Sequence, residues 1–209
     1  MEYRLKSVVF PLIIITTIVF IIQFFNRGFT ELFLLDSAGV LRRPWILITH
    51  IFLHANPYHL FLNMWVLFMF GPLLEEKIGP NRFLLFYILS GIAAGFIASF
   101  FYSKSLGASG AIMALIGVLI ILMPNLQVLF FYFVPTPLWV AGIIFAVIDL
   151  MGVVYPSGVG NVAHLSGMGL GLLYGIYLKR QKSSFQKKFS KKKHLEEVDV
   201  NEYLKSGRI

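Results

Sequence analysis

Residues 107–124 read GASGAIMALIGVLIILMP, an apolar stretch that opens with glycine, alanine and serine and closes on a proline. It holds no charged side chain, so a helix built from it needs an apolar environment on every face. The stretch follows a loop, and Pro124 cannot continue a helix. We therefore predict a short membrane-spanning helix over Ser109–Met123.

The composition of the whole chain favours the membrane. Of its 209 residues, 57% are hydrophobic and 13% are charged, and the mean hydropathy is +0.78. An average soluble domain is roughly 45–50% apolar and about 25% charged. This chain has too little polar surface for a soluble globular, disordered or disulfide-rich secreted protein. It has no cysteine, which excludes disulfides, thiol nucleophiles and cysteine-bound metals.

Five further apolar segments come near the length of about 20 residues that crosses a bilayer. With the first stretch they predict an all-α polytopic membrane protein, a bundle of six transmembrane helices in residues 1–178. The stretch 128–135 is apolar but too short to cross. The five segments are Val8–Phe25, Pro57–Leu74, Phe83–Tyr102, Pro137–Val153 and Val159–Leu178.

The basic residues predict the orientation. Ten of the 18 lysines and arginines lie in residues 179–209, beside four acidic residues. Six spans place both termini on one side, and the positive-inside rule makes that side the cytoplasm. We predict a basic cytoplasmic tail over residues 179–209 that is attracted to anionic lipid headgroups rather than to nucleic acid. The short amino end without a transit signal predicts a prokaryotic plasma membrane.

Among the polar side chains of the predicted spans, five are candidates for a role at depth: His59, Asn63, Ser109, Asp149 and His164. Polar groups at this depth are costly and therefore point to function. There is no His-Glu-x-x-His motif and no second membrane carboxylate, so neither a metalloprotease nor an aspartic protease is expected. His50 and His54, spaced i, i+4, are the alternative that a zinc site would use. We predict no metal and no cofactor.

Ser109 is the candidate nucleophile. At the start of its helix, backbone N–H groups without helical partners can stabilise an oxyanion. His164 is the candidate base, because it is the only histidine in the last three spans. Small residues on both helices predict a close approach, as a Ser–His hydrogen bond of about 2.6–3.2 Å requires. These small residues are Gly110, Ala114 and Gly117 on one helix and Gly167, Gly171 and Gly175 on the other.

His59 and Asn63 are spaced i, i+4 and share one helix face. Both can donate hydrogen bonds, so we predict that they stabilise the oxyanion. No acidic residue is expected to orient His164, and Asp149 is expected to cap or pair locally. The mechanism would then be a Ser–His dyad. Each polar residue taken alone is also explained by helix packing, and the catalytic interpretation depends on their combination.

The order of these motifs resembles the rhomboid intramembrane serine proteases. The resemblance covers roughly residues 40–178, and its motifs are His59-x-x-x-Asn63, Gly107-x-Ser109-Gly110, Ala163-His164 with Gly167-x-x-x-Gly171, Thr49-His50-x-x-x-His54, Glu75-x-x-x-Gly79 and Ser90-Gly91. It implies a six-helix core that cleaves transmembrane or membrane-near segments of other proteins. It also implies that Ser109 is the nucleophile, His164 the base, and His59 and Asn63 the oxyanion-stabilising side chains.

The resemblance further implies that residues 26–56 form a large first loop and that the short apolar piece before the fifth span is a cap loop. Two positions depart from the family pattern. Trp45-Ile46 stands where the family has Trp-Arg, with Arg42 and Arg43 upstream, and Met113 stands where an aromatic residue is common. We expect single-span membrane proteins as substrates. The alternatives are a non-catalytic relative that binds membrane helices and a small transporter.

Overall fold

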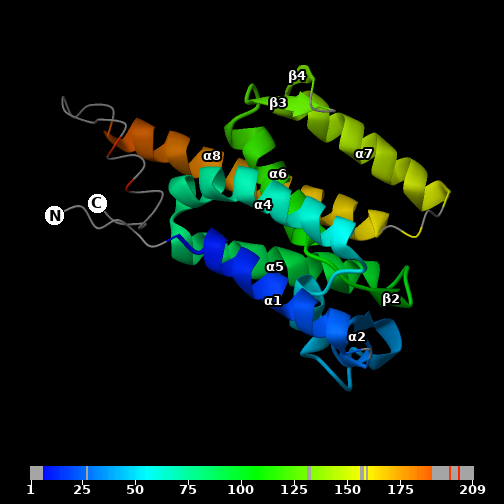
Figure 1. Ribbon diagram of the computed structural model, residues 1–209. Helices are drawn as coiled ribbons and strands as arrows, with labels where there is room; N and C mark the ends of the chain where they lie inside the picture. The colour runs from blue at the N-terminus through cyan, green and yellow to red at the C-terminus, as the bar shows by residue number, and fades with distance from the viewer. Residues whose placement is uncertain are drawn as a thin grey trace.

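The fold is organised around α6 (Ser109–Leu122), in a computed structural model that describes residues 7–26, 28–130, 133–155, 158, 160–189, 198 and 202. Every residue of this helix from Gly110 to Leu119 is buried. It contacts four of the five other long helices, α4, α5, α7 and α8, and Figure 1 shows it at the centre of the molecule. A helix that is apolar on all faces is buried on all faces, as its sequence predicts.

Three helices cover one side of α6. Helix α1 (Val9–Phe25) packs along α4 (Pro57–Ile78), which turns directly into α5 (Pro80–Ala98). The turn is Gly79, whose φ of 80° suits a glycine because it has no Cβ. Helix α4 therefore ends four residues later than the predicted Leu74, and α5 begins and ends earlier than the predicted Phe83–Tyr102.

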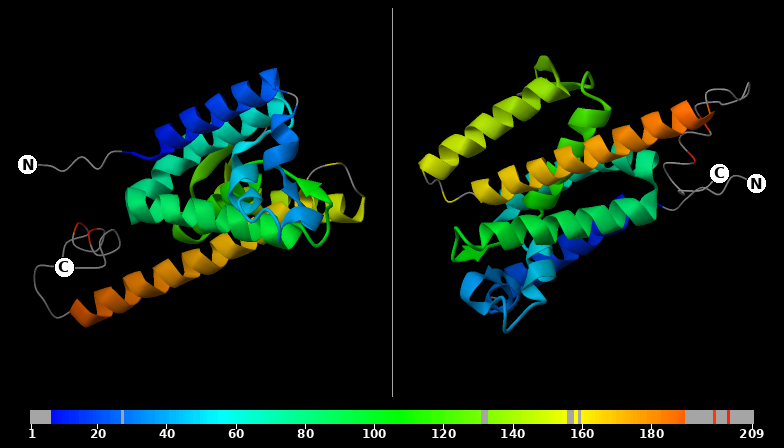
Figure 2. Two further views of the ribbon diagram at one scale, coloured as in Figure 1. Left: turned by 90° about the horizontal axis from the view of Figure 1, so that it is seen from below. Right: turned by 180° about the vertical axis from the view of Figure 1, so that it is seen from behind.

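Two helices cover the other side. Helix α8 (Asn161–Phe189) lies against α6 and α5, and α7 (Leu138–Val154) lies at the outer edge beside α8 (Figure 2). Helix α8 runs past Leu178 into the predicted basic tail, because the residues beyond it are still good helix formers. The remainder of the predicted tail, like Arg4 and Lys6 at the other end, falls on residues that the structure does not describe, Val198 and Glu202 apart.

Two described helices, α4 and α5, are long and apolar enough to cross a membrane by length and composition alone. Helices α1, α6 and α7 are apolar and shorter. The described chain is mostly helical. The count of six transmembrane helices stays a prediction.

Besides its helices, the described chain contains two short antiparallel strand pairs that the sequence does not predict. Strand β1 (Leu35–Asp36) pairs with β2 (Lys104–Ser105), and β3 (Gln127–Phe130) pairs with β4 (Val134–Pro137). The β3–β4 hairpin is the piece that was expected to be the cap loop. It follows the end of α6, whereas Ser109 begins α6, so it lies at the opposite end of that helix from the candidate nucleophile (Figure 1).

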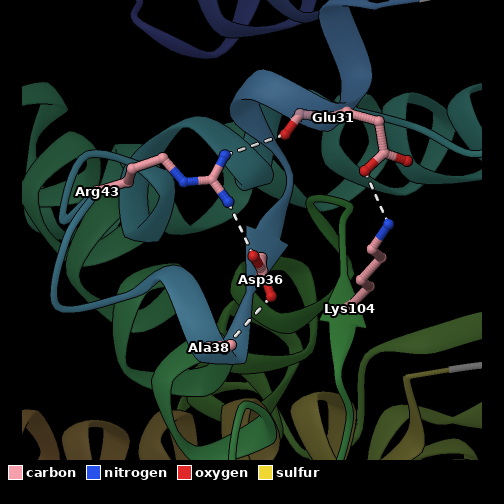
Figure 3. A network of polar contacts seen from close by, with 5 residues as sticks. All are labelled: Glu31, Asp36, Ala38, Arg43 and Lys104. Carbon is pink, nitrogen blue, oxygen red and sulfur yellow. Dashed lines mark hydrogen bonds and ion pairs between the residues drawn. The ribbon is translucent and has the colours of Figure 1, made fainter.

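Two ion pairs brace the first loop, residues 26–56 (Figure 3). Neither involves Ile46, which stands where the family has the arginine of its Trp-Arg motif. Arg43 donates from Nη1 to the Glu31 carbonyl at 3.2 Å and from Nη2 to Asp36 Oδ2 at 2.8 Å. Lys104 Nζ on β2 meets Glu31 Oε2 at 2.8 Å. The shifted arginine therefore holds this loop, and Lys104 ties it to the segment that leads into α6.

Glu75 joins α1 to α4. Its carboxylate accepts from Ser7 Oγ and from the Val8 backbone N–H, each at 2.6 Å. The glutamate is 8% exposed. A carboxylate at a helix start satisfies N–H groups that lack helical partners and complements the helix dipole. This contact sets the position of α1 along α4.

Candidate active site

Ser109 lies where a loop turns into the central helix. Gly107 precedes it with a φ of +125°, which favours glycine, and its N–H donates to the His50 carbonyl at 2.9 Å. Ala108 precedes the helix and offers no side-chain cap. The first N–H groups of α6 therefore have no helical acceptor and stay available to an oxygen atom near Ser109.

Helices α6 and α8 approach each other through their small residues, as predicted. A Cβ added to Gly167 would overlap the Gly110 carbonyl, and one added to Gly171 would overlap the carbonyl of Ala114. A Cβ added to Gly110 would lie 3.6 Å from the Ala163 carbonyl oxygen. Gly110 and Ala163 are the immediate neighbours of Ser109 and His164, so this contact brings the two candidate residues into one region.

The structure places Ser109 and His164 in this region, but their side chains are not hydrogen-bonded to each other. No hydrogen bond between Ser109 Oγ and the His164 ring occurs in the described part of the chain. Both residues are partly exposed, in contrast to the fully buried helix that follows Ser109.

His59 lies across the loop from the serine. A Cβ added to Gly107 would lie 2.8 Å from His59 Cε1 and 3.8 Å from Ser109 Oγ. The Ala55 N–H donates to His59 Nδ1 at 3.4 Å. A neutral imidazole that accepts at Nδ1 carries its proton on Nε2, and Nε2 is the nitrogen beside Gly107. His59 is therefore an N–H donor on the Ser109 side.

Asn63 lies one turn further along α4 and is 6% exposed. Its Nδ2 donates to the His59 carbonyl at 3.0 Å, within the same helix. One amide proton is thus used locally, and the second stays available. The Asn56 side chain caps this helix by accepting from the His59 N–H at 2.8 Å, so the start of α4 positions both residues.

Asp149 corrects the expectation that no acidic residue orients His164. Its Oδ1 lies 2.9 Å from His164 Nδ1, in a contact between α7 and α8. The sequence offers a weak signal for this pair: the two residues are only 15 positions apart, on helices that follow each other in the chain. The helical rotation that aims them at each other is not readable from that spacing.

His50 and His54 lie in the first loop and serve its packing. His50 Nδ1 donates to the Ile46 carbonyl at 2.9 Å, and its Nε2 packs on Gly95. The His54 ring is fully buried, has no hydrogen-bond partner among the described side chains and backbone groups, and packs edge-on against His59 at 5.0 Å. Within the described residues, no three His, Asp or Glu side chains are grouped to hold a metal ion.

Acidification is expected to destabilise the protein through these two rings. Burial lowers the pKa of His50 to about 4, and burial together with the His59 charge lowers the pKa of His54 to about 4. Between pH 6.5 and 4 the unfolded chain binds protons that the folded chain does not, so stability falls as the pH falls. Once the pH is below both pKa values, the free energy of unfolding has fallen by up to about 3 kcal/mol for each ring.

Thermal unfolding in detergent from pH 7.5 to 4 checks this expectation. The His54→Leu protein is the test variant, because it removes one titrating ring, and its midpoint should fall less steeply with pH. Equal slopes for the two proteins would contradict the assignment.

Comparisons with known proteins identify the family. The family model for the Rhomboid domain matches residues 41–181, more than half of the chain. The chain belongs to the rhomboid family. This family is embedded in membranes, includes serine intramembrane proteases and acts on membrane proteins within the bilayer.

Individual relatives give the same family. The chain is 35% identical over 140 residues to Rhomboid protein 1, mitochondrial, of Saccharomyces cerevisiae, which covers 62% of this chain and 40% of the yeast protein. It is 35% identical over 126 residues to rhomboid protease GluP of Bacillus subtilis, and the match covers 59% of this chain and 24% of GluP. It is 25% identical over 144 residues to rhomboid protease GlpG of Haemophilus influenzae, and the match covers 68% of this chain and 74% of GlpG. The chain spans less than half of the yeast and Bacillus proteins.

The names of these relatives bear on the predicted location. The yeast protein and a relative from Arabidopsis thaliana, 30% identical over 148 residues (69% of this chain and 47% of the plant protein), are described as mitochondrial. Two others come from bacteria. The comparisons thus support a membrane protein and do not favour the plasma membrane.

Proposed function

We propose that this protein is an intramembrane serine endopeptidase that cleaves single-span membrane proteins in transmembrane or membrane-near segments. The observation that carries the proposal is the close contact of α6 and α8 at Gly110 and Ala163, next to Ser109 and His164. Membership of a family that includes such proteases supports it. The chemistry needs no metal and no cofactor.

In the proposed reaction, Ser109 Oγ attacks the carbonyl carbon of a substrate peptide bond. His164 takes the hydroxyl proton and returns it to the leaving amine. The oxyanion is held by the free N–H groups at the start of α6, by His59 Nε2–H and by Asn63. A water molecule then hydrolyses the acyl-enzyme, with His164 again as base, and the serine is regenerated.

The length of α6 supports access of water to the site. Its 14 residues span about 21 Å, less than the ~30 Å hydrocarbon core. If α6 ends near one surface, Ser109 lies below the other surface in a cavity that admits water. A substrate helix must fray before its peptide bonds can react, so substrates should carry helix-weakening residues near the cleaved bond.

The proposal includes a topology. Six transmembrane helices, α1 and α4 to α8, place both termini in the cytoplasm, and the basic residues after Leu178 contact anionic lipid there. A prokaryotic plasma membrane is our proposal for the location. Proteolysis of the protein in sealed inverted vesicles tests the orientation, because the cytoplasmic tail would then be accessible.

A fluorophosphonate probe tests the activity directly, because it reacts only with an activated serine. The detergent-solubilised protein should be labelled, and peptide mapping by mass spectrometry should find the label on Ser109. A protein that binds membrane helices but stays unlabelled would instead be a non-catalytic rhomboid relative.

A further inference from the structure

The second half of α7 buries one residue, and that residue is charged. Among its described residues from Ile143 to Val154, Asp149 alone is buried, at 5% exposure. Its neighbours Ile148 and Leu150 are more than half exposed. In a membrane helix a carboxylate is costly unless it is paired. Helix α7 is thus rotated so that its apolar side chains face outward and its one carboxylate faces the bundle.

The partner of that carboxylate is the candidate base. Asp149 Oδ1 and His164 Nδ1 are 2.9 Å apart, with side-chain exposures of 8% and 18%. An ionised carboxylate can only accept a hydrogen bond, so Nδ1 of His164 carries a proton. In a neutral imidazole this leaves Nε2 without a proton, and only an unprotonated nitrogen can accept the proton of Ser109.

The other groups that face His164 do not compete for this role. From α4, His59 offers an N–H on the side of Gly107. From the segment between α5 and β2, the Tyr102 hydroxyl accepts from the Val162 N–H at 3.3 Å, in the first turn of α8. Helix α6 contributes no titratable side chain. Asp149 is therefore the carboxylate that faces this imidazole among the described residues.

We propose that Asp149 is a positioning residue for His164, which converts the expected dyad into a Ser–His–Asp arrangement across α6, α8 and α7. The inference rests on the proposed protease function. Asp149 acts through the imidazole: it sets the tautomer, fixes the ring plane and stabilises the imidazolium formed when Ser109 loses its proton.

The kinetic test replaces Asp149 by asparagine and by leucine in the full chain in detergent. The kcat for a single-span substrate and the rate of fluorophosphonate labelling should each fall by about 100-fold. The KM should change by no more than about 2-fold, because Asp149 does not contact substrate. An unchanged kcat in both variants would overturn the proposal.

A matched control separates positioning from packing. Gly152 lies one turn from Asp149, and a Cβ there would overlap the Asn161 side chain. The Gly152→Ala protein disturbs the α7–α8 contact while leaving the Asp149–His164 pair in place. It should lose thermal stability and keep most of its kcat. A loss of kcat as large as that of Asp149→Asn, at equal stability, would show that Asp149 acts only through packing.

Nitrogen NMR of the protein labelled with ¹⁵N-histidine measures the tautomer of His164 directly. This measurement keeps Asp149 in place, so it does not depend on whether an Asp149 variant folds. His164, assigned with the His164→Ala protein, should show the Nδ1–H tautomer, whereas His59 should show Nε2–H. An Nε2–H signal for His164 would overturn the proposal. If the unaltered protein failed to react with the probe, the protease function would fall, while the tautomer would still show whether Asp149 holds the ring.

Discussion

The Ser109→Ala protein is expected to cleave a single-span substrate at the background rate. Alanine removes the one oxygen that can attack the peptide carbonyl, while the oxyanion donors and the substrate contacts stay in place. The loss should be at least about 10³-fold, measured by gel densitometry of the products in detergent micelles. The His164→Ala protein should lose a similar factor, and the double variant should lose no more, because the two residues act as one unit.

The Ser105→Ala protein is the control for this experiment. Ser105 lies four residues upstream, in β2, where its backbone pairs with Leu35. Its replacement should leave cleavage unchanged. Cleavage that persists in the Ser109→Ala protein would exclude the proposed mechanism, whatever the other variants do.

The Gly171→Ala protein is expected to unfold at a much lower temperature. The new Cβ would overlap the backbone of Ala114, at its carbonyl oxygen, carbonyl carbon and Cα, and backbone atoms cannot move aside as a side chain can. Helices α6 and α8 must then separate, at a cost of at least about 1–3 kcal/mol. The separation should also reduce cleavage, because it moves His164 away from Ser109.

The same helix offers a matched control. Gly169 lies two residues away, and a Cβ added there meets nothing within 4 Å. Alanine at this position should keep the activity and should slightly stabilise the protein, because alanine costs less backbone entropy in a helix than glycine. If the two variants had equal unfolding midpoints in detergent, the close contact of α6 and α8 would not contribute to stability.

These two predictions test different parts of the site. Loss of Ser109 removes a reacting atom and should leave the fold intact, so the unfolding midpoint should not change. Loss of Gly171 should change the fold first and the activity as a consequence. The acid sensitivity expected from His50 and His54 concerns a third region, the first loop, where both rings are held neutral by burial.

Several features could be predicted because they depend on local sequence. The apolar run before Pro124, which follows a loop and opens with glycine, alanine and serine, predicts a short helix that begins at Ser109. The glycine spacing at 167, 171 and 175 predicts a smooth helix face at a period that the α-helix imposes. Both predictions are confirmed, since each follows from backbone geometry within one segment.

Other features were missed because they depend on how segments are rotated against each other. The Asp149–His164 pair is one. The partners of Arg43 are another, since the sequence shows arginines at 42 and 43 but not which groups of the first loop they contact. A shift of one residue turns a helical side chain by about 100°, so no spacing rule can decide such pairs.

The sequence by itself determined that this chain is an apolar helical protein with a serine at the start of a short apolar helix and a glycine face on a later helix. Those properties arise from composition and helical periodicity, which act within each segment. Only the tertiary structure decided which carboxylate meets the candidate base. The packing of both helices on their neighbours sets their relative rotation, and that rotation aims Asp149 at His164 instead of at lipid.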